Sequence, residues 1–414
     1  MVETPSRALA RQRGFTLVEL SVSLFVTVSV LLGVLMLLDF SNKLSRVQTN
    51  VADMQQSLRI AQYDMVRLIR MAGRGGLPAG NLPAGTAVVV RDNVTDGDRI
   101  GGPGTPEILV GSDVLTVRGV FTAPIYQMAA ADPAAFQLTV QGGLPVAGTL
   151  RVRSTTPTSI PQNLAALKQA VLDRRPEALL VVSPLNNSVY AVVELDPAAS
   201  DVTNDDLYTI AFRISGGQYT AQYAAFSSDG PGTFPANLTS AAFLGLLEEY
   251  RFYVRQEFAV AGDKTSDLTS KLSRARVYPG TEVPYGDNTA NWRSDIADNI
   301  IDLQVALGLD TANGGCTVAA DEVSCAIAET ADGQSDDWMF NGETAADPAF
   351  GGADLHYIRL NTLARTDRRD KDYESPLLVR IEDHAFAAAS PFNAAPERMF
   401  RRRLLRTVID MRNL

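Results

Sequence analysis

The chain has 414 residues, 46% of them hydrophobic, and its 37 Lys and Arg against 47 Asp and Glu give a net charge of −10. This length suits one large domain or two small ones beyond any membrane anchor. The negative charge argues against a general nucleic-acid-binding protein, which needs a basic surface to contact phosphates.

The N-terminal region combines a short basic leader with a long apolar stretch. Arg7, Arg11 and Arg13 come first, and no charged residue occurs from Leu20 to Leu38. As a helix these 19 residues would span about 28 Å, close to the thickness of the hydrocarbon core of a bilayer. A secretory signal has a shorter apolar region followed by a small-residue cleavage site. The pattern therefore predicts a retained anchor with a cytoplasmic N-terminus and an exported remainder.

The apolar pattern continues beyond the anchor as an amphipathic stripe with alternating steps of three and four residues. No proline occurs between Thr16 and Met71, and a glycine cluster that begins at Gly73 ends the pattern. A single helix from about Thr16 to about Ala72 is predicted, with an anchor followed by a separate short coiled coil as the alternative. The stripe consists of Leu44, Val47, Val51, Met54, Leu58, Ala61, Met65 and Leu68.

Glu19 places a carboxylate at the start of the apolar helix, where an unpaired charge is costly. The heptapeptide Arg13–Glu19 (RGFTLVE) resembles the prepilin signal of type IV pilins and type II secretion pseudopilins. The resemblance implies cleavage by a prepilin peptidase between Gly14 and Phe15, N-methylation of Phe15, and a mature chain of 400 residues, which is 414 less 14. It also implies that Glu19 meets the N-terminal amine of a neighbouring subunit in the fibre. The simpler alternative is that Glu19 only caps the helix or reaches the membrane surface.

A Gly- and Pro-rich hinge at Gly73–Gly85 leads into a region of short β-like runs. These runs predict a mostly antiparallel sheet packed on the second half of the helix. Helices are predicted only at Pro161–Arg174, Ala241–Leu247 and Pro396–Arg406. The β-like runs are Glu107–Phe121, which holds two, Ala135–Val140, Gly148–Ser154, Ala178–Ser183, Asn187–Leu195, Leu207–Ile214, Glu249–Val260, Asn299–Asp310 and His356–Thr366.

Several segments are similar to PilW-like minor pilins, one branch of the pilin family. The resemblance implies an α+β fold of the type IV pilin kind, with a long N-terminal helix packed on a large antiparallel β-rich domain. The similar segments are Gln55–Gly76, Ser112–Val120, Asn299–Asp310, Tyr357–Tyr373 and Phe400–Leu414, which ends in an Arg-Asn pair at Arg412 and Asn413.

The predicted organisation has four parts: a leader at 1–14, a membrane half of the helix at 15–40, an amphipathic half at 41–73, and a periplasmic domain at 74–414. No internal repeat and no clear linker divides the exported part. Two stretches, about 144–203 and 312–352, resemble nothing in the family and are interpreted as lineage-specific insertions.

Cys316 and Cys325 are the only cysteines. In an exported chain they are predicted to form a disulfide that closes an eight-residue loop, with two free thiols as the alternative. Calcium binding by Asp332, Asp336 and Asp337 is a weak hypothesis, since oxygen ligands suit that ion but the full EF-hand pattern is missing. The preferred interpretation of the acidic block between residues 294 and 358 is a solvated face.

The remaining polar residues form no recognisable catalytic pattern. The arginines at Arg401–Arg403 predict a C-terminal amphipathic element that faces solvent or pairs with the acidic block, in preference to a site for DNA phosphates. His356 and His384 have no acid–base partner apparent in the sequence and are interpreted as surface or strand-packing residues. No hydrolase or nucleotide-binding glycine motif occurs. Neither enzymatic activity nor a cofactor is expected.

The resemblance thus implies a minor pilin of a bacterial type IV pilus that primes assembly, lies at or near the fibre tip, and supports twitching motility, adhesion or DNA uptake. The implied partners are other minor pilins and the major pilin through the helix, the prepilin peptidase, and the inner-membrane assembly platform. Nucleic acid is not an expected partner. The implied location is the inner membrane, with an exported C-terminal domain, and then the fibre at the cell surface.

Two alternatives stay open. One is a J-type pseudopilin of a type II secretion system, whose chains are typically much shorter. The other is a membrane-anchored adhesin or binding module that uses the signal only for display.

Overall fold

The computed structural model shows a chain that forms two compact units, residues 1–53 and residues 54–414. The described residues are 16–77, 87–101, 105–128, 132–184, 189–217, 227–229, 233–258, 260, 263, 268–285, 292–310, 338–340, 354–387 and 390–411.

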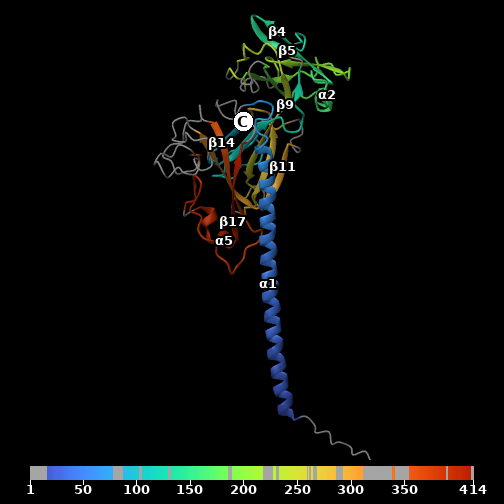
Figure 1. The fold of residues 1–414 in the computed structure, drawn as a ribbon. Coiled ribbons are helices and arrows are strands. Elements are labelled where there is room, and N and C mark those ends of the chain that lie inside the picture. Colours follow the sequence, from blue (N-terminus) through green and yellow to red (C-terminus); the bar gives the residue numbers. More distant parts are fainter. Residues whose placement is uncertain are drawn as a thin grey trace, which may run out of the picture. The chain divides into compact units, whose positions relative to one another are not determined.

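The N-terminal helix α1 (Leu17–Ile69) is continuous over 53 residues and contributes to both units (Figure 1). The prediction of one long helix is therefore confirmed, and the alternative of an anchor and a separate coiled coil is wrong. After Ile69 the chain turns sharply, and Gly73, Gly75 and Gly76 all have positive φ angles. A Cβ atom on Gly75 would lie 2.8 Å from Val120 Cγ2, so this turn requires glycine.

The larger sheet has eleven strands within the described residues, and all of its pairs are antiparallel. The main path runs β1-β2-β9-β6-β7-β8-β5-β4, while β3 and β10 also pair with β9, and β11 pairs with β10. The strands are β1 (Val88–Arg91), β2 (Val114–Gly119), β3 (Tyr126–Gln127), β4 (Phe136–Gln141), β5 (Leu144–Arg153), β6 (Ala178–Val182), β7 (Tyr190–Leu195), β8 (Leu207–Arg213), β9 (Phe243–Arg255), β10 (Lys271–Val277) and β11 (Arg293–Asp298).

Strand β9 joins the two halves of this sheet. Its first residues pair with β6, and its last residues pair with β10 on one side and β2 on the other. The predicted helix at Ala241–Leu247 is wrong, because Phe243–Leu247 forms the start of β9. A short apolar run fits a buried strand as well as a buried helix, and the backbone partners offered by β6 decide in favour of the strand.

A second sheet has the order β13-β12-β14-β17, again antiparallel, and a small hairpin, β15–β16, accompanies it. The β-rich prediction is thus confirmed, although the described strands form three sheets instead of one. The strands are β12 (Ile300–Asp310), β13 (Trp338–Met339), β14 (Asp354–Arg365), β15 (Arg380–Ile381), β16 (His384–Ala385) and β17 (Arg402–Asp410).

The predicted C-terminal helix at Pro396–Arg406 is largely wrong. Only α5 (Ala395–Arg398) is helical, and it follows a 3₁₀ turn, η2 (Pro391–Asn393). Residues from Arg402 onward pair with β14 over the whole length of β17. Pairing with a formed neighbour strand overrides local helix propensity here.

The core of the larger sheet lies between β4–β9 and the helix α2 (Ala165–Leu172), whose Leu167, Ala170 and Val171 are buried in it. The helix predicted at Pro161–Arg174 is therefore confirmed in its central part. The segment 144–203, interpreted from the sequence as an insertion, supplies β5, α2, β6 and β7 to this layer. Of the segment 312–352, only 338–340 are described.

Candidate functional site

The start of α1 is a capping box built from Thr16 and Glu19. Glu19 Oε2 accepts hydrogen bonds from the backbone N–H of Thr16 at 3.0 Å and from Thr16 Oγ1 at 2.9 Å. In return, the backbone N–H of Glu19 donates to Thr16 Oγ1 at 3.3 Å. Glu19 therefore does cap its own helix, and Oε1 accepts no hydrogen bond from the described residues. Gly14 and Phe15, the predicted cleavage and methylation residues, lie outside the described residues.

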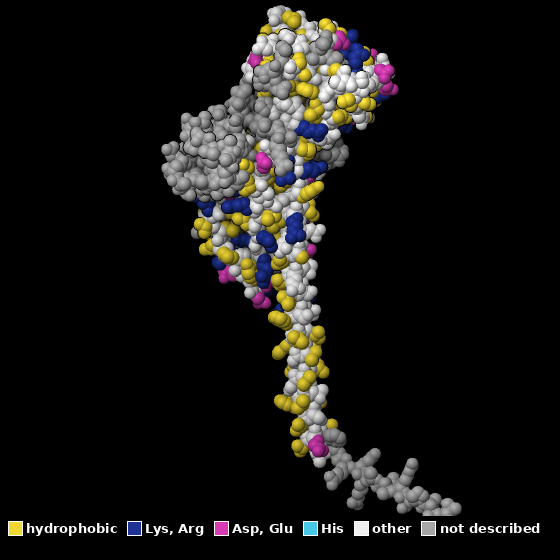
Figure 2. All heavy atoms as spheres, viewed as in Figure 1, with side chains coloured by type: hydrophobic (Ala, Val, Ile, Leu, Met, Phe, Trp, Pro, Cys, Tyr) yellow, Lys and Arg dark blue, Asp and Glu magenta, His cyan; other side chains and the backbone are white. Residues whose placement is uncertain are grey.

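The apolar part of α1 meets the requirements of a membrane span by length and composition, and its most apolar window is entirely exposed in this chain. Figure 2 shows hydrophobic side chains crowding its surface. The hydroxyl groups within it are all internally satisfied, since each donates to a backbone carbonyl three or four residues earlier. These bonds are Ser21 to Leu17 at 2.9 Å, Ser23 to Leu20 at 3.0 Å, Thr27 to Ser23 at 2.7 Å and Ser29 to Phe25 at 2.9 Å.

The second half of α1 is amphipathic, and from Met54 onward it belongs to the larger compact unit. The predicted stripe is buried from Met54 onward, through Leu58, Ala61, Met65 and Leu68. Ile60 and Tyr63, on the other face, remain exposed. Packing on one face only is what the three-four spacing predicts.

Two polar connections fix this half of α1 to the larger sheet. Arg274 Nη1, on β10, donates to both carboxylate oxygens of Asp64, at 3.0 and 2.9 Å. At the helix end, the backbone N–H of Gly73 donates to the carbonyl of Arg118 at 3.0 Å, and that of Val120 donates to the carbonyl of Arg74 at 2.9 Å. The helix end is thus hydrogen-bonded to β2 and to the residue that follows it.

A buried acidic residue, Asp113, directly precedes β2 of the larger sheet and connects it to β12 of the second sheet. Asp113 Oδ1 accepts from the backbone N–H of Asn93 at 2.9 Å, and Oδ2 accepts from that of Val305, on β12, at 2.7 Å. Burial raises the pKa of the Asp113 carboxyl well above its ordinary value, and the nearby Asp92 and Asp302 add to this, although the two N–H bonds oppose it.

His384 has an acidic partner after all. Its Nδ1 lies 3.1 Å from Asp302 Oδ2, and both side chains are largely buried. The residues are 82 positions apart, so nothing in the sequence indicates this pair. A Cβ atom on Gly111 would lie 2.4 Å from His384 Nε2, so glycine makes room for the ring. No group of acidic, histidine or cysteine residues that could hold a metal ion occurs among the described residues.

Glu382, beside His384, gathers three side chains of the second sheet. Its carboxylate accepts from Arg359 at 2.5 Å and from Asn361 at 2.6 Å, and it lies 3.4 Å from Arg406. The Glu382 side chain is only 2% exposed. The β15–β16 hairpin is thereby held against one face of β14 and β17.

The C-terminal arginines pair with acids, as one of the two predicted alternatives requires, but the partners differ. Arg398 pairs with Glu374 at 2.7 Å and Arg401 with Asp370 at 2.8 Å. These acids lie after the acidic block, not within it. Within the block, Asp295 is exposed and also paired, since it lies 2.8 Å from Arg255.

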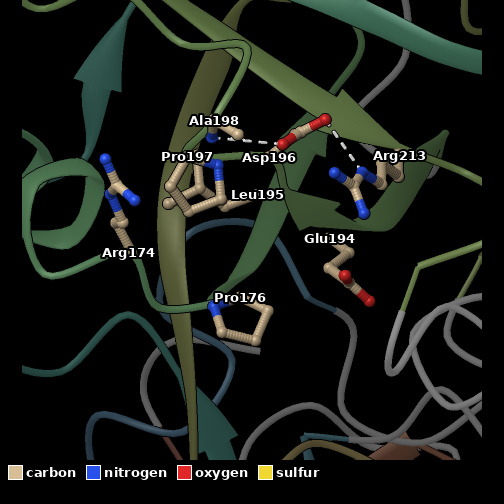
Figure 3. A pocket seen from close by; sticks show the side chains of 8 residues that line it. All are labelled: Arg174, Pro176, Glu194, Leu195, Asp196, Pro197, Ala198 and Arg213. Carbon is tan, nitrogen blue, oxygen red and sulfur yellow. Dashed lines mark hydrogen bonds and ion pairs between the residues drawn. The ribbon is translucent and has the colours of Figure 1, made fainter.

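One small pocket of about 210 Å³ lies beside β7 and β8 (Figure 3). Asp196 accepts from Arg213 Nε at 2.8 Å, and Arg174 lies on the other side of Pro197. Burial acts to raise the pKa of Asp196, but Arg213 and the N–H of Ala198 lower it below its ordinary value. The lining holds no histidine, serine or cysteine, and we assign it no chemistry. It consists of Arg174, Pro176, Glu194, Leu195, Asp196, Pro197, Ala198 and Arg213.

Some predicted site residues fall outside the described part of the chain. These are Cys316, Cys325, Asp332, Asp336 and Asp337, together with the side chain of His356. Their predicted disulfide, calcium and packing roles stay predictions.

Comparison with known families agrees with this arrangement. Residues 9–35 match the family model described as the prokaryotic N-terminal methylation motif. Residues 251–413 match the model described as type IV pilus-assembly protein W, a stretch that begins in β9 and includes all of the second sheet. No curated protein and no solved structure gives a match.

Proposed function

We propose that the chain, a PilW-like type IV minor pilin by its family matches, enters the pilus through α1 after cleavage between Gly14 and Phe15 and N-methylation of Phe15. Before assembly, the precursor is anchored in the inner membrane with residues 74–414 exported. Other minor pilins, the major pilin, the prepilin peptidase and the inner-membrane assembly platform are the proposed partners. Its role is structural, not enzymatic.

The geometry of Glu19 carries this proposal. Within the chain, Glu19 Oε2 takes both hydrogen bonds from Thr16, which leaves Oε1 open among the described residues. An N-terminal ammonium from a neighbouring subunit can therefore bind Oε1 without breaking the helix cap. In the apolar interior of a helix bundle, each charge lowers the desolvation cost of the other.

The size of the exported unit supports a position at or near the fibre tip. The compact unit at 54–414 contains 361 residues, counted inclusively from those bounds. A subunit repeated along the shaft has to fit beside its neighbours at every turn, whereas a subunit at the end does not. From that place it primes assembly and supports motility, adhesion or DNA uptake. The match of residues 251–413 to the pilus family favours this role over a type II secretion pseudopilin.

Mass spectrometry of the chain purified from sheared fibres tests the processing step. The expected mature protein begins at a methylated Phe15. A chain that still carries residues 1–14 in the fibre contradicts the proposal. Gly14→Ala is expected to be processed more fully than Gly14→Leu, because a bulky side chain obstructs the peptidase.

Incorporation of Glu19 variants tests the assembly step. Glu19→Ala is expected to insert in the membrane and to be cleaved, but to be strongly depleted from fibres. Asp39→Ala is the matched control, since Asp39 is an exposed acid on the same helix and, among the described residues, pairs only with Lys43 at 3.6 Å. Equal incorporation of Glu19→Ala and wild type would remove the role assigned to Glu19.

A further inference from the structure

Strand β4 ends the larger sheet and has a free edge. Among the described strands it pairs with β5 alone, and Figure 1 shows the β4–β5 hairpin at one end of the sheet. Its sequence, FQLTVQ, contains no charged residue and no proline. Natural sheets protect exposed edges with charges or prolines, because an unprotected edge invites another strand.

The other edge strands of four or more described residues are protected in this way. β1 ends in Arg91, β11 contains Arg293 and Asp295, and β17 contains several arginines. The hairpin also exposes apolar side chains, with Val140 59% exposed and Leu144 71% exposed. β4 is therefore the described edge best suited to accept a strand.

The backbone direction of β4 follows from one hydrogen bond. The carbonyl of Ala135 accepts from the N–H of Arg151, on β5, at 2.9 Å. Bonded positions alternate along an antiparallel strand, so the groups of Ala135, Gln137 and Thr139 face β5. The register shift after Thr139 places its extra residue on β5, so β4 keeps this alternation. The backbone groups of Leu138 and Val140 therefore face the free edge.

The residues Gln137–Gln141 read nearly the same in both directions, as Q-L-T-V-Q. We propose that β4 pairs antiparallel with β4 of a second copy of this chain, about a two-fold axis at Thr139. In this register Leu138 lies opposite Val140 of the second copy, and each exchanges backbone hydrogen bonds with the other. Gln137 lies opposite Gln141, and the two Thr139 residues face each other. This contact is independent of assembly through α1.

The same register keeps each face of the sheet uniform. Phe136, Leu138 and Val140 share one face of β4, where Phe136 is buried in the core and Leu138 packs against it. Directly opposite residues in an antiparallel pair share a face. The second copy therefore extends this apolar row and covers Val140. The polar row of Gln137, Thr139 and Gln141 stays on the solvent face. A shift by one residue would mix the two rows.

Disulfide trapping of the full chain in native membranes tests the register. The two Thr139 residues form a non-hydrogen-bonded pair, whose Cα atoms lie about 4.5 Å apart in antiparallel sheets, within disulfide range. Thr139→Cys is expected to give an oxidised dimer that joins two differently tagged copies. Thr149→Cys, on the interior strand β5, is the matched control and is expected to give none. The wild type measures any background from Cys316 and Cys325.

Charge variants in the Thr139→Cys background then separate true pairing from chance collision. Gln137 and Gln141 are both exposed, so lysine or glutamate at these positions does not disturb the core. Gln137→Lys with Gln141→Lys places like charges opposite each other, and loss of the dimer is expected. Gln137→Lys with Gln141→Glu places opposite charges there, and the dimer is expected to persist.

Three outcomes would overturn the proposal. The first is the absence of a mixed-tag dimer with Thr139→Cys. The second is an equal yield from both charge variants, which indicates random collision. The third is a Thr139→Cys product joined to a different protein, which assigns this edge to another partner.

Discussion

Asp64 and Arg274 are 210 positions apart in the sequence, yet Arg274 Nη1 lies 3.0 and 2.9 Å from the two carboxylate oxygens of Asp64. Arg274 also lies 5.3 Å from the ring centroid of Tyr250. The side chain of Arg274 is 25% exposed and that of Asp64 is 19% exposed, so water screens this ion pair only in part. This pair fixes the amphipathic half of α1 to the larger sheet.

A double-mutant cycle with Asp64→Asn and Arg274→Gln measures this connection. A partly buried pair lies between the exposed and fully buried cases, so a coupling energy of about 1–2 kcal/mol is expected. The measurement is the thermal unfolding of the full chain in detergent. Arg67→Gln, which removes the more exposed partner of Asp64, is expected to cost less. Strictly additive effects of Asp64→Asn and Arg274→Gln would show that the contact contributes nothing.

Glu382 is expected to be among the most sensitive positions of the second sheet. Glu382→Ala removes the buried carboxylate that accepts from Arg359 and Asn361, at a cost of about 3–5 kcal/mol. Glu374→Ala is the matched control, since that carboxylate is 63% exposed and, among the described residues, pairs only with Arg398. About 0–1 kcal/mol is expected there. Equal losses in chemical denaturation would contradict the role given to the buried network.

Stability is expected to fall as pH rises through the titration of Asp383. Burial raises the pKa of this carboxyl to about 7, and the neighbouring Asp92 adds to the shift. The unfolded chain has a carboxyl pKa of about 3.9, so between about pH 4 and 7 the folded state holds a proton that the unfolded state has lost. The stabilisation that the protonated Asp383 carboxyl gives to the folded state is thus fully present below about pH 4 and is lost by about pH 7.

Asp383→Asn isolates this contribution, because its amide keeps the shape of the protonated acid and does not titrate. The difference in melting temperature between variant and wild type is expected to grow in favour of the variant from pH 5 to pH 7.5. A difference that stays constant over this range would show that Asp383 titrates normally in the folded chain.

Thr16 is expected to support Glu19 in assembly. Thr16→Val removes the hydroxyl that donates to Glu19 Oε2 and accepts from its N–H, a cap worth about 0.5–2 kcal/mol. The backbone N–H of residue 16 still donates, so fibre incorporation should fall less than with Glu19→Ala. Thr16→Ser keeps the hydroxyl and should behave as wild type. Quantitative immunoblotting of sheared fibres measures how much of each variant is incorporated relative to wild type. Equal loss in Thr16→Val and Thr16→Ser would show that the hydroxyl has no role in assembly.

Periodic features of this chain could be predicted from the sequence. The spacing of Met54, Leu58 and Met65 determines both the helix and its buried face. The alternating runs likewise predicted β8, β12 and β14. The start of β9 could not be predicted, because an apolar run without period fits either structure until β6 supplies its partner.

Contacts between distant segments leave no local signal. Nothing near Asp64 or Glu382 indicates Arg274 or Arg359, because topology alone brings these residues together. The Thr16–Glu19 box is different, since threonine followed three residues later by glutamate is itself a helix-start signal. The cap could therefore be predicted from the sequence as an alternative. That both hydrogen bonds from Thr16 go to Oε2, and none from the described residues to Oε1, is seen only in the structure.

The hydrogen bonds of Gly73 and Val120 also have a mechanical consequence. If the chain enters a fibre as proposed, tension on α1 would pass through these bonds to β2 at the C-terminal end of the helix. β2 is an interior strand, held by β1 on one side and β9 on the other, so two ladders share the load. Resistance to force would then depend on the rate at which the hydrogen bonds of β2 to its two neighbouring strands break, and not on the equilibrium stability of the whole domain.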